Sequence, residues 1–101
     1  MLQMNSLIIE GKIKKAAFVE GDVCSAKFTI ENETTYNVSC FDCELYGSFA
    51  EKIYPKLKEG QIVRIVGQLR EKRSEENGKI VSQVYVLCEH IEFRKKTEKA
   101  S

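Results

Sequence analysis

The sequence lacks a long apolar run, an excess of either charge, and tryptophan. No apolar stretch approaches the ~20 residues that a membrane-spanning helix needs. The N-terminus has no basic region followed by a long apolar run, so we expect no signal peptide. The net charge is only +1. Any nucleic-acid or membrane partner must therefore be met by a local patch of charge.

Signatures of catalysis and of metal binding are also missing. We find no nucleophile–base pair and no glycine loop suited to phosphate, so we expect a non-enzymatic protein without a cofactor. Four cysteines without an export signal favour a reducing compartment and free thiols. Cys40 and Cys43 have the spacing of metal ligands, but residues i and i+3 of a strand point to opposite faces. We therefore expect no metal site.

What the chain does contain suits one small globular domain. It has 101 residues, of which 43% are hydrophobic and 31% charged, which is enough for one modest core. We place this domain at residues 1–94. The polar residues 95–101 are expected to form a short disordered tail.

Alternation of apolar and polar residues predicts five strands, at residues 5–14, 24–31, 38–46, 61–70 and 80–93. Residues 15–22 read as a loop. Residues 71–79 read as a charged hairpin tip with Asn77-Gly78 as its turn pair. A change of facing near Glu89 indicates a β-bulge in the last strand.

A short helix is predicted between the third and fourth strands. Ser48 and Glu51 have the spacing of a capping box, and Pro55 predicts a kink or an end near Tyr54. Gly60 is suited to the left-handed conformation that ends a helix. The apolar stripe of this helix consists of Phe49, Ile53 and Leu57.

The order of these elements is three strands, one helix and two strands. Five short strands in so small a chain bury their core and protect their edges best by closing into a barrel. The predicted fold class is therefore all-β: a five-stranded OB-fold barrel with one short helix between strands 3 and 4.

Three segments together resemble the bacterial single-stranded DNA-binding protein family, as a truncated or divergent member. They are Asn5-Ser-Leu-Ile-Ile-Glu-Gly-Lys-Ile, Leu45-Tyr-Gly-Ser-Phe-Ala-Glu and Leu57-Lys-Glu-Gly-Gln-Ile-Val-Arg-Ile-Val-Gly-Gln-Leu-Arg. The resemblance covers about residues 4–93. It implies binding of single strands by aromatic stacking and phosphate contacts, without sequence specificity.

The resemblance also implies the residues that would bind DNA. Tyr46 matches a stacking position, and Tyr36 falls near a second one, in a connection that is shorter here. Exposed tyrosines are, however, also common on sheets with one face in solvent. Four basic residues match phosphate contacts: Lys58, Arg70, Lys72 and Arg73. The alternative for the last three is a solvated hairpin tip. Three outward lysines are further candidates: Lys12, Lys14 and Lys27.

The chain departs from the family pattern at several positions. Cys40 and Ser74 stand where aromatics are usual. Asp42 and Glu44 place two carboxylates on the face where DNA would bind, and a carboxylate repels phosphate. The C-terminal tail has no acidic tip of the kind through which the family recruits partner enzymes.

The resemblance implies a role in DNA replication, recombination or repair. It also implies a homodimer or homotetramer, possible contacts with replication or repair proteins, and a cytoplasmic, nucleoid-associated place in a bacterium. The alternative is an OB-fold module similar to primosomal replication protein N, which acts mainly through protein–protein contacts and binds DNA weakly. The lost aromatics and the acidic third strand favour this alternative.

Overall fold

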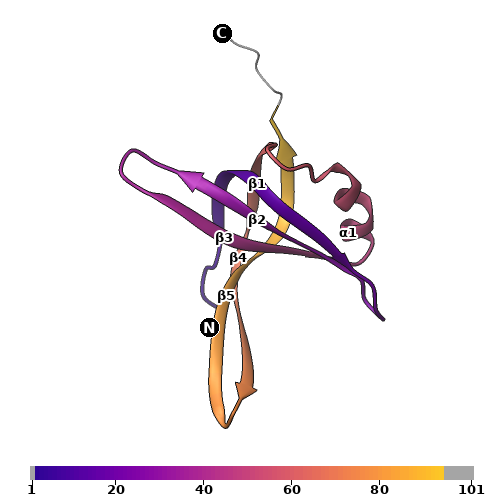
Figure 1. Ribbon diagram of the computed structural model, residues 1–101, viewed down its shortest axis with the longest axis vertical. Helices are drawn as coiled ribbons and strands as arrows, with labels where there is room; N and C mark the ends of the chain where they lie inside the picture. The colour runs from indigo at the N-terminus through magenta and orange to yellow at the C-terminus, as the bar shows by residue number, and fades with distance from the viewer. Residues whose placement is uncertain (1, 95–101) are drawn as a thin grey trace.

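The computed structural model describes residues 2–94 (Figure 1), so the predicted tail at 95–101 lies outside the described residues. The elements follow in the order β1 (Leu7–Val19), β2 (Ser25–Glu33), β3 (Val38–Tyr46), α1 (Gly47–Ile53), a 3-10 turn η1 (Tyr54–Lys56), β4 (Ile62–Glu76) and β5 (Lys79–Phe93).

The five strands close into a barrel in the order β1-β2-β3-β5-β4. All neighbours are antiparallel except β3 and β5, which close the barrel by a short parallel pairing at Cys43↔Val86 and Glu44↔Leu87. Closure leaves no open sheet edge inside the barrel. The predicted OB-fold, with its helix directly after the third strand, is confirmed.

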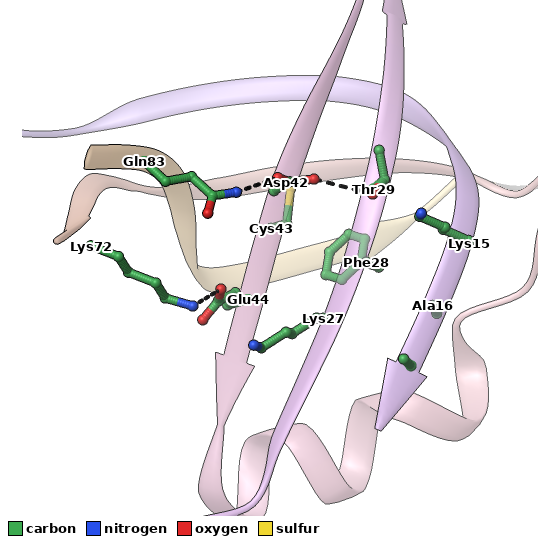
Figure 2. Close-up of a pocket in the computed structure, with 11 residues that line it drawn as sticks. Lys15, Ala16, Lys27, Phe28, Thr29, Asp42, Cys43, Glu44, Lys72 and Gln83 are labelled. Carbon is green, nitrogen blue, oxygen red and sulfur yellow. Dashed lines mark hydrogen bonds and ion pairs between the residues drawn. The ribbon is translucent and has the colours of Figure 1, made fainter. Parts of the chain in front are cut away.

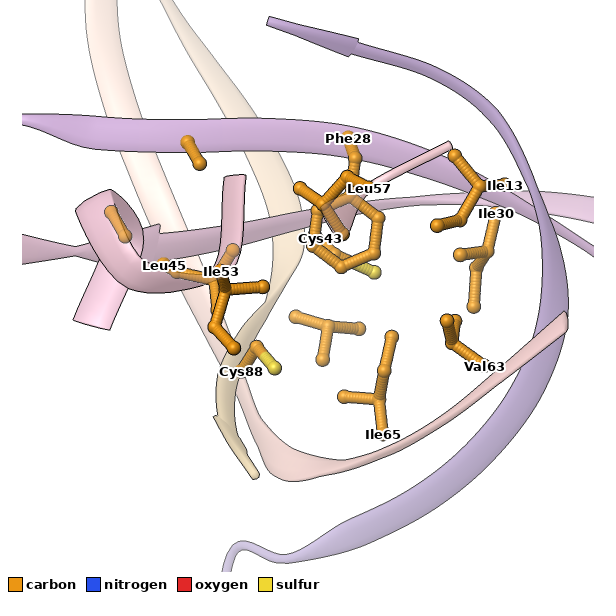
Figure 3. Close-up of a cluster of buried hydrophobic side chains, with 13 residues drawn as sticks. Ile13, Phe28, Ile30, Cys43, Leu45, Ile53, Leu57, Val63, Ile65 and Cys88 are labelled. Carbon is orange, nitrogen blue, oxygen red and sulfur yellow. The ribbon is translucent and has the colours of Figure 1, made fainter. Parts of the chain in front are cut away.

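The core lies inside the barrel and comes from alternate residues of its strands (Figure 3). Its largest fully buried side chains are Ile13, Ile30, Cys43, Leu45, Val63 and Ile65. The helix closes one end of the barrel with Ala50 and Ile53, and the predicted stripe continues to the buried Leu57. Alternation in the sequence thus identified most of the core.

The first strand is longer than predicted. Residues 15–19 were expected in a loop, but they pair with β2 through Lys15↔Thr29 to Val19↔Ser25. A register shift between Ile13 and Lys15 reverses the facing of the strand, which hides its second half from a simple period of two. After the shift, Phe18 faces the helix end, and its ring centroid lies 5.3 Å from that of Tyr54.

The helix begins without the predicted capping box. Tyr46 is the N-cap and makes no side-chain cap hydrogen bond, while Ser48 already lies within α1. Gly47 has a φ of +67°, so the chain turns sharply out of β3, and the N-cap is Tyr46, two residues before the predicted Ser48. The prediction that Pro55 ends the helix near Tyr54 is confirmed, because α1 stops at Ile53. Neither helical segment of the described residues is long and apolar enough to span a membrane.

The predicted bulge at Glu89 is confirmed. Val66 pairs with His90 and Gly67 pairs with Cys88, so Glu89 is left without a partner across the ladder. At the same place the Leu87 carbonyl approaches Gly67 so closely that a Cβ there would overlap its oxygen. The bulge therefore requires glycine opposite it.

Residues 71–79 are not an irregular tip. The strands β4 and β5 continue as a ladder to Glu76↔Lys79, joined by Asn77 and Gly78, which both have positive φ as a two-residue hairpin turn requires. We call residues 69–85 the arm. It projects from the barrel (Figure 1), which explains a radius of gyration of 15.0 Å, compared with about 13 Å for a compact chain of this length.

Candidate nucleic-acid interface

A groove with a volume of about 370 Å³ crosses the outer faces of β1, β2 and β3 at the root of the arm (Figure 2). Its polar lining combines three lysines, two carboxylates, a hydroxyl and an amide: Lys15, Lys27, Lys72, Asp42, Glu44, Thr29 and Gln83. Three strands, β1, β2 and β3, and the arm contribute to it. The outward face of β2 and β3 is the surface that OB-folds use for oligonucleotides.

Glu44 is a buried carboxylate on this outward face. Only 5% of the residue is exposed. Its Oε2 forms an ion pair with Lys72 of the arm, and its Oε1 accepts a hydrogen bond from the Tyr46 hydroxyl. The negative charge that the sequence places on this face is therefore neutralised by Lys72 and covered, and it also fastens the arm to β3.

Two tyrosines contact the Glu44–Lys72 pair, Tyr46 at the carboxylate and Tyr85 at the ammonium group. Burial, hydrogen bonding to Glu44 and the proximity of Tyr85 raise the pKa of the Tyr46 hydroxyl, which stays a donor at neutral pH. The Lys72 ammonium lies 4.8 Å from the centroid of the Tyr85 ring, within cation–π distance. Tyr46 is nevertheless 38% exposed, so part of the residue remains open to a ligand.

Asp42 forms a second link between the strands. Thr29 of β2 donates from Oγ1 to Asp42 Oδ1 at 3.2 Å, and Gln83 of the arm donates from Nε2 to Asp42 Oδ2 at 3.1 Å. Unlike Glu44, Asp42 is exposed. The root of the arm is thus attached to β3 at two points, through Lys72 and through Gln83.

Two lysines of the groove take no part in these contacts. Within residues 2–94, no carboxylate lies within ion-pair distance of Lys15 or Lys27. Both residues are exposed, and they extend from neighbouring strands β1 and β2 (Figure 2). Their charges are available to an anionic ligand such as a phosphodiester backbone.

The structure brings three of the predicted site residues together. Tyr46 and Lys72 share Glu44. Arg70 pairs with Tyr85 across the arm, and Lys72 pairs with Gln83, so these side chains share the arm face that turns toward β3. Arg70 also contacts Gln68 through a hydrogen bond of 3.4 Å.

The other three predicted residues lie elsewhere. Tyr36 is 90% exposed in the connection between β2 and β3. Lys58 lies in the connection between η1 and β4 and does not line the groove. Arg73 lies on the opposite face of the arm from Lys72, where its Nε binds Glu71 at 3.2 Å. DNA contacts by these residues stay predictions.

Three residues of the groove were not among the predicted site residues, namely Lys15, Thr29 and Gln83, and neither was Tyr85, which lies beside Lys72. Tyr85 carried a usable signal, since it is an outward aromatic on a long strand. Lys15 carried none, because the register shift at Lys14 concealed its strand. Thr29 and Gln83 become relevant only through their contact with Asp42, which joins residues from three strands.

Of the four cysteines, Cys43 lines the groove, between Asp42 and Glu44 on β3, and the other three do not. Cys40 is exposed and Cys43 is buried, as opposite facing on β3 predicts. Burial raises the pKa of the Cys43 thiol, and that of Cys88, to about 12. In residues 2–94, no group of three or more histidine, cysteine or acidic side chains has the arrangement of a metal site.

The closed five-stranded barrel with its helix directly after β3 defines an OB-fold protein. The fold is similar to that of a small single-stranded DNA-binding protein from Streptomyces coelicolor, with a TM-score of 0.76 and 13% identity over 93% of this chain and 97% of that one. It is similar also to the SSB of Plasmodium falciparum in its complex with ssDNA, with a TM-score of 0.80 and 14% identity over 94% and 98%.

At this level of identity the likeness establishes the fold. The sequence matches no protein-family model, and no curated protein matches it.

Proposed function

We propose that this protein binds single-stranded DNA in the groove over β1, β2 and β3, without requiring a defined sequence. The observation that carries the proposal is the groove, where Lys15 and Lys27 are free for phosphate. Tyr46 and Tyr85 lie beside it, in contact with its residues Glu44 and Lys72. Two solved structures of similar fold belong to single-stranded DNA-binding proteins, one of them in complex with ssDNA. Binding rather than catalysis is the proposed activity.

The neutralised Glu44 supports this proposal. A bare carboxylate at the centre of the face would repel phosphate, but Lys72 and Tyr46 cover this one. The repulsion expected from the sequence is thereby reduced to the single exposed charge of Asp42. The positive charges of Lys15 and Lys27 outweigh this one negative charge.

A fluorescence titration with oligo-dT at low and physiological salt tests the proposal. We expect saturable binding that weakens with salt, because each phosphate contact contributes about −0.7 to the slope of log K against log salt for single strands. Replacing both Lys15 and Lys27 by alanine should flatten this slope. The control is Lys56→Ala, an exposed lysine of η1 outside the groove. No binding at low salt contradicts the proposal.

Tyr46 is the proposed stacking residue. We expect Tyr46→Ala to weaken binding of oligo-dT roughly 5- to 150-fold, since stacking contributes about 1–3 kcal/mol per base. Tyr46→Phe is the matched control, because it keeps the ring and removes only the hydroxyl that binds Glu44. If Tyr46→Ala binds as tightly as the wild type at low salt, Tyr46 does not stack on DNA.

A second candidate function is an interaction module of the primosomal replication protein N type. Apolar side chains on the other side of the arm favour it. Phe41, Leu69 and Val84 are exposed large hydrophobics that surround a small cavity of about 110 Å³. Binding of oligo-dT only at very low salt would support this candidate, and saturable binding at physiological salt would support the first.

We also propose that this protein associates with further copies of itself. Its proposed role is in DNA replication, recombination or repair at the bacterial nucleoid. Ile8, which is 70% exposed, and Ile62 lie on the outer face of β1 and β4. Exposed apolar residues on a strand face are suited to contact with a second copy. Sedimentation analysis should show a dimer or tetramer, and Ile8→Asp should yield monomers if this face is the interface.

A further inference from the structure

The floor of the groove has a polar feature that stacking and phosphate contacts do not use. Asp42 is exposed there, between Thr29 of β2 and Gln83 of the arm (Figure 2). Thr29 donates a hydrogen bond to Oδ1 at 3.2 Å, and Gln83 donates one to Oδ2 at 3.1 Å. Because one donor holds each oxygen, the orientation of the carboxylate is fixed.

This carboxylate retains capacity to accept hydrogen bonds. Each oxygen of an ionised carboxyl group has two lone pairs, and the structure gives each Asp42 oxygen one donor from the protein. Two adjacent oxygens in fixed orientation complement a pair of parallel N–H donors, as in bidentate pairing with a guanidinium. The vacant acceptor positions thus suit a ligand with two parallel donors.

Nucleic-acid bases differ sharply in this respect. Guanine presents two parallel donors on its Watson–Crick edge, N1–H and the N2 amino group. Thymine presents one N–H between two carbonyl oxygens, which an anionic carboxylate repels. Cytosine and adenine each offer one amino group beside an acceptor nitrogen. In single strands these edges are unpaired and can be read by side chains.

The surroundings of Asp42 fit one nucleotide. The groove volume of about 370 Å³ lies at the lower end of the range of small-molecule sites. Lys15 and Lys27 are available for the phosphates on either side. Glu44, the second groove carboxylate, does not compete for the base because it is buried against Lys72 and Tyr46.

We propose that Asp42 recognises the Watson–Crick edge of a guanine in the groove and gives this protein a preference for guanine over thymine. The inference rests on the proposed function and deepens it. Phosphate contacts and stacking provide affinity for any strand, while Asp42 discriminates at one base position. Thr29 and Gln83 act as positioning residues for its carboxylate.

Three oligonucleotides of equal length test the proposal: repeats of TTG, repeats of TTI, where I is inosine, and oligo-dT. Isolated guanines avoid quadruplexes, and hypoxanthine, the base of inosine, lacks only the N2 amino group of guanine. We expect the TTG repeat to bind roughly tenfold more tightly than oligo-dT, because a bidentate contact to one base favours that base over the others by a factor of about this size. The TTI repeat should fall between the two.

Two variants assign the preference to Asp42. Asp42→Asn replaces one acceptor oxygen by a donor at nearly constant shape and should abolish the preference for TTG over oligo-dT. Glu59→Gln is the control, since it removes one exposed carboxylate outside the groove and should leave the preference unchanged. Circular dichroism during thermal unfolding shows that both variants are folded.

The outcomes separate this inference from the proposed function. Equal affinity for all three oligonucleotides overturns the inference and leaves the proposed function intact. A preference for TTG that persists in Asp42→Asn also overturns it. Absence of binding to all three at low salt overturns the proposed function and this inference with it.

Discussion

The strands β4 and β5 pass through two regions of different physical character. Inside the barrel their residues alternate between buried and exposed, with Val63, Ile65, Val86 and Cys88 in the core. In the arm, residues 69–85, no residue is buried. The same ladder is therefore held by a packed core in one region and by cross-strand pairs alone in the other.

The contacts of the arm with the barrel follow from this difference. Without a core of its own, the arm is positioned at its root by Lys72 on Glu44, by Gln83 on Asp42, and by Asn5, whose side chain binds both backbone groups of Leu69. Polar contacts of this kind can be exchanged for contacts with a ligand. A buried aliphatic core cannot be exchanged in this way. The groove accordingly lies where the two regions meet.

The largest effect is expected where the barrel depends on its bulge. Gly67→Ala should reduce the free energy of unfolding by about 3 kcal/mol, because the new Cβ overlaps the Leu87 carbonyl oxygen and the backbone must move. Urea unfolding measures the change. Gly21→Ala, in an exposed loop where the nearest atom lies 3.8 Å from the new Cβ, should change stability little. Equal effects would show that the bulge tolerates a side chain.

A matched pair of valines compares the two regions directly. Val63→Ala, in the barrel at 0% exposure, should cost about 2 kcal/mol through lost burial and a residual cavity. Val84→Ala, in the arm at 60% exposure, should cost less than about 0.5 kcal/mol. Urea unfolding of both variants measures the difference. Similar losses for the two would mean that the arm is packed against something the monomer does not contain.

A double-mutant cycle compares the two ion pairs of the arm. Removing Lys72 leaves the buried carboxylate of Glu44 uncompensated and should cost about 1–2 kcal/mol, less than for a fully buried pair because the lysine is partly exposed. Glu44→Gln should restore most of this loss. The exposed Arg73–Glu71 pair should show coupling below about 1 kcal/mol. Equal coupling energies would contradict the anchoring role of Glu44.

Alkaline pH should weaken the barrel through its buried thiols. The pKa of Cys43 and that of Cys88 are raised by burial to about 12, so the unfolded chain loses these protons first and stability falls as pH rises above about 9. Each thiol should account for about 1 kcal/mol between pH 9 and pH 10. Cys43→Ala should reduce this slope, whereas replacement of the exposed Cys40 should not. A slope unchanged in Cys43→Ala contradicts the assignment.

Sequence reasoning located the parts of the fold that are governed by local rules. Alternation of apolar and polar residues predicted β3, and the Asn77-Gly78 pair predicted the hairpin turn. The interruption of this alternation near Glu89 predicted the bulge. These features succeed because their signal lies within a few consecutive residues. The capping box failed, since Gly47 starts the helix earlier than Ser48 would.

The candidate site was less accessible to such reasoning. Tyr46 and Lys72 were named from the sequence, but their common partner Glu44 was expected to be an exposed carboxylate. Its burial depends on Lys72, which is 28 residues distant in the chain. Lys15 was hidden by a register shift that only pairing with β2 defines.

The sequence by itself determined the closed five-stranded barrel, the place of its helix and the residues of its core, because burial of apolar side chains acts through a period that is visible along the chain. Only the tertiary structure decided the chemistry of the groove. Contacts between the root of the arm and β3 neutralise Glu44 and help to fix the orientation of Asp42, while Lys15 and Lys27 line the same groove without such contacts. Charges act through space, so their partners are set by distances that the order of residues does not contain.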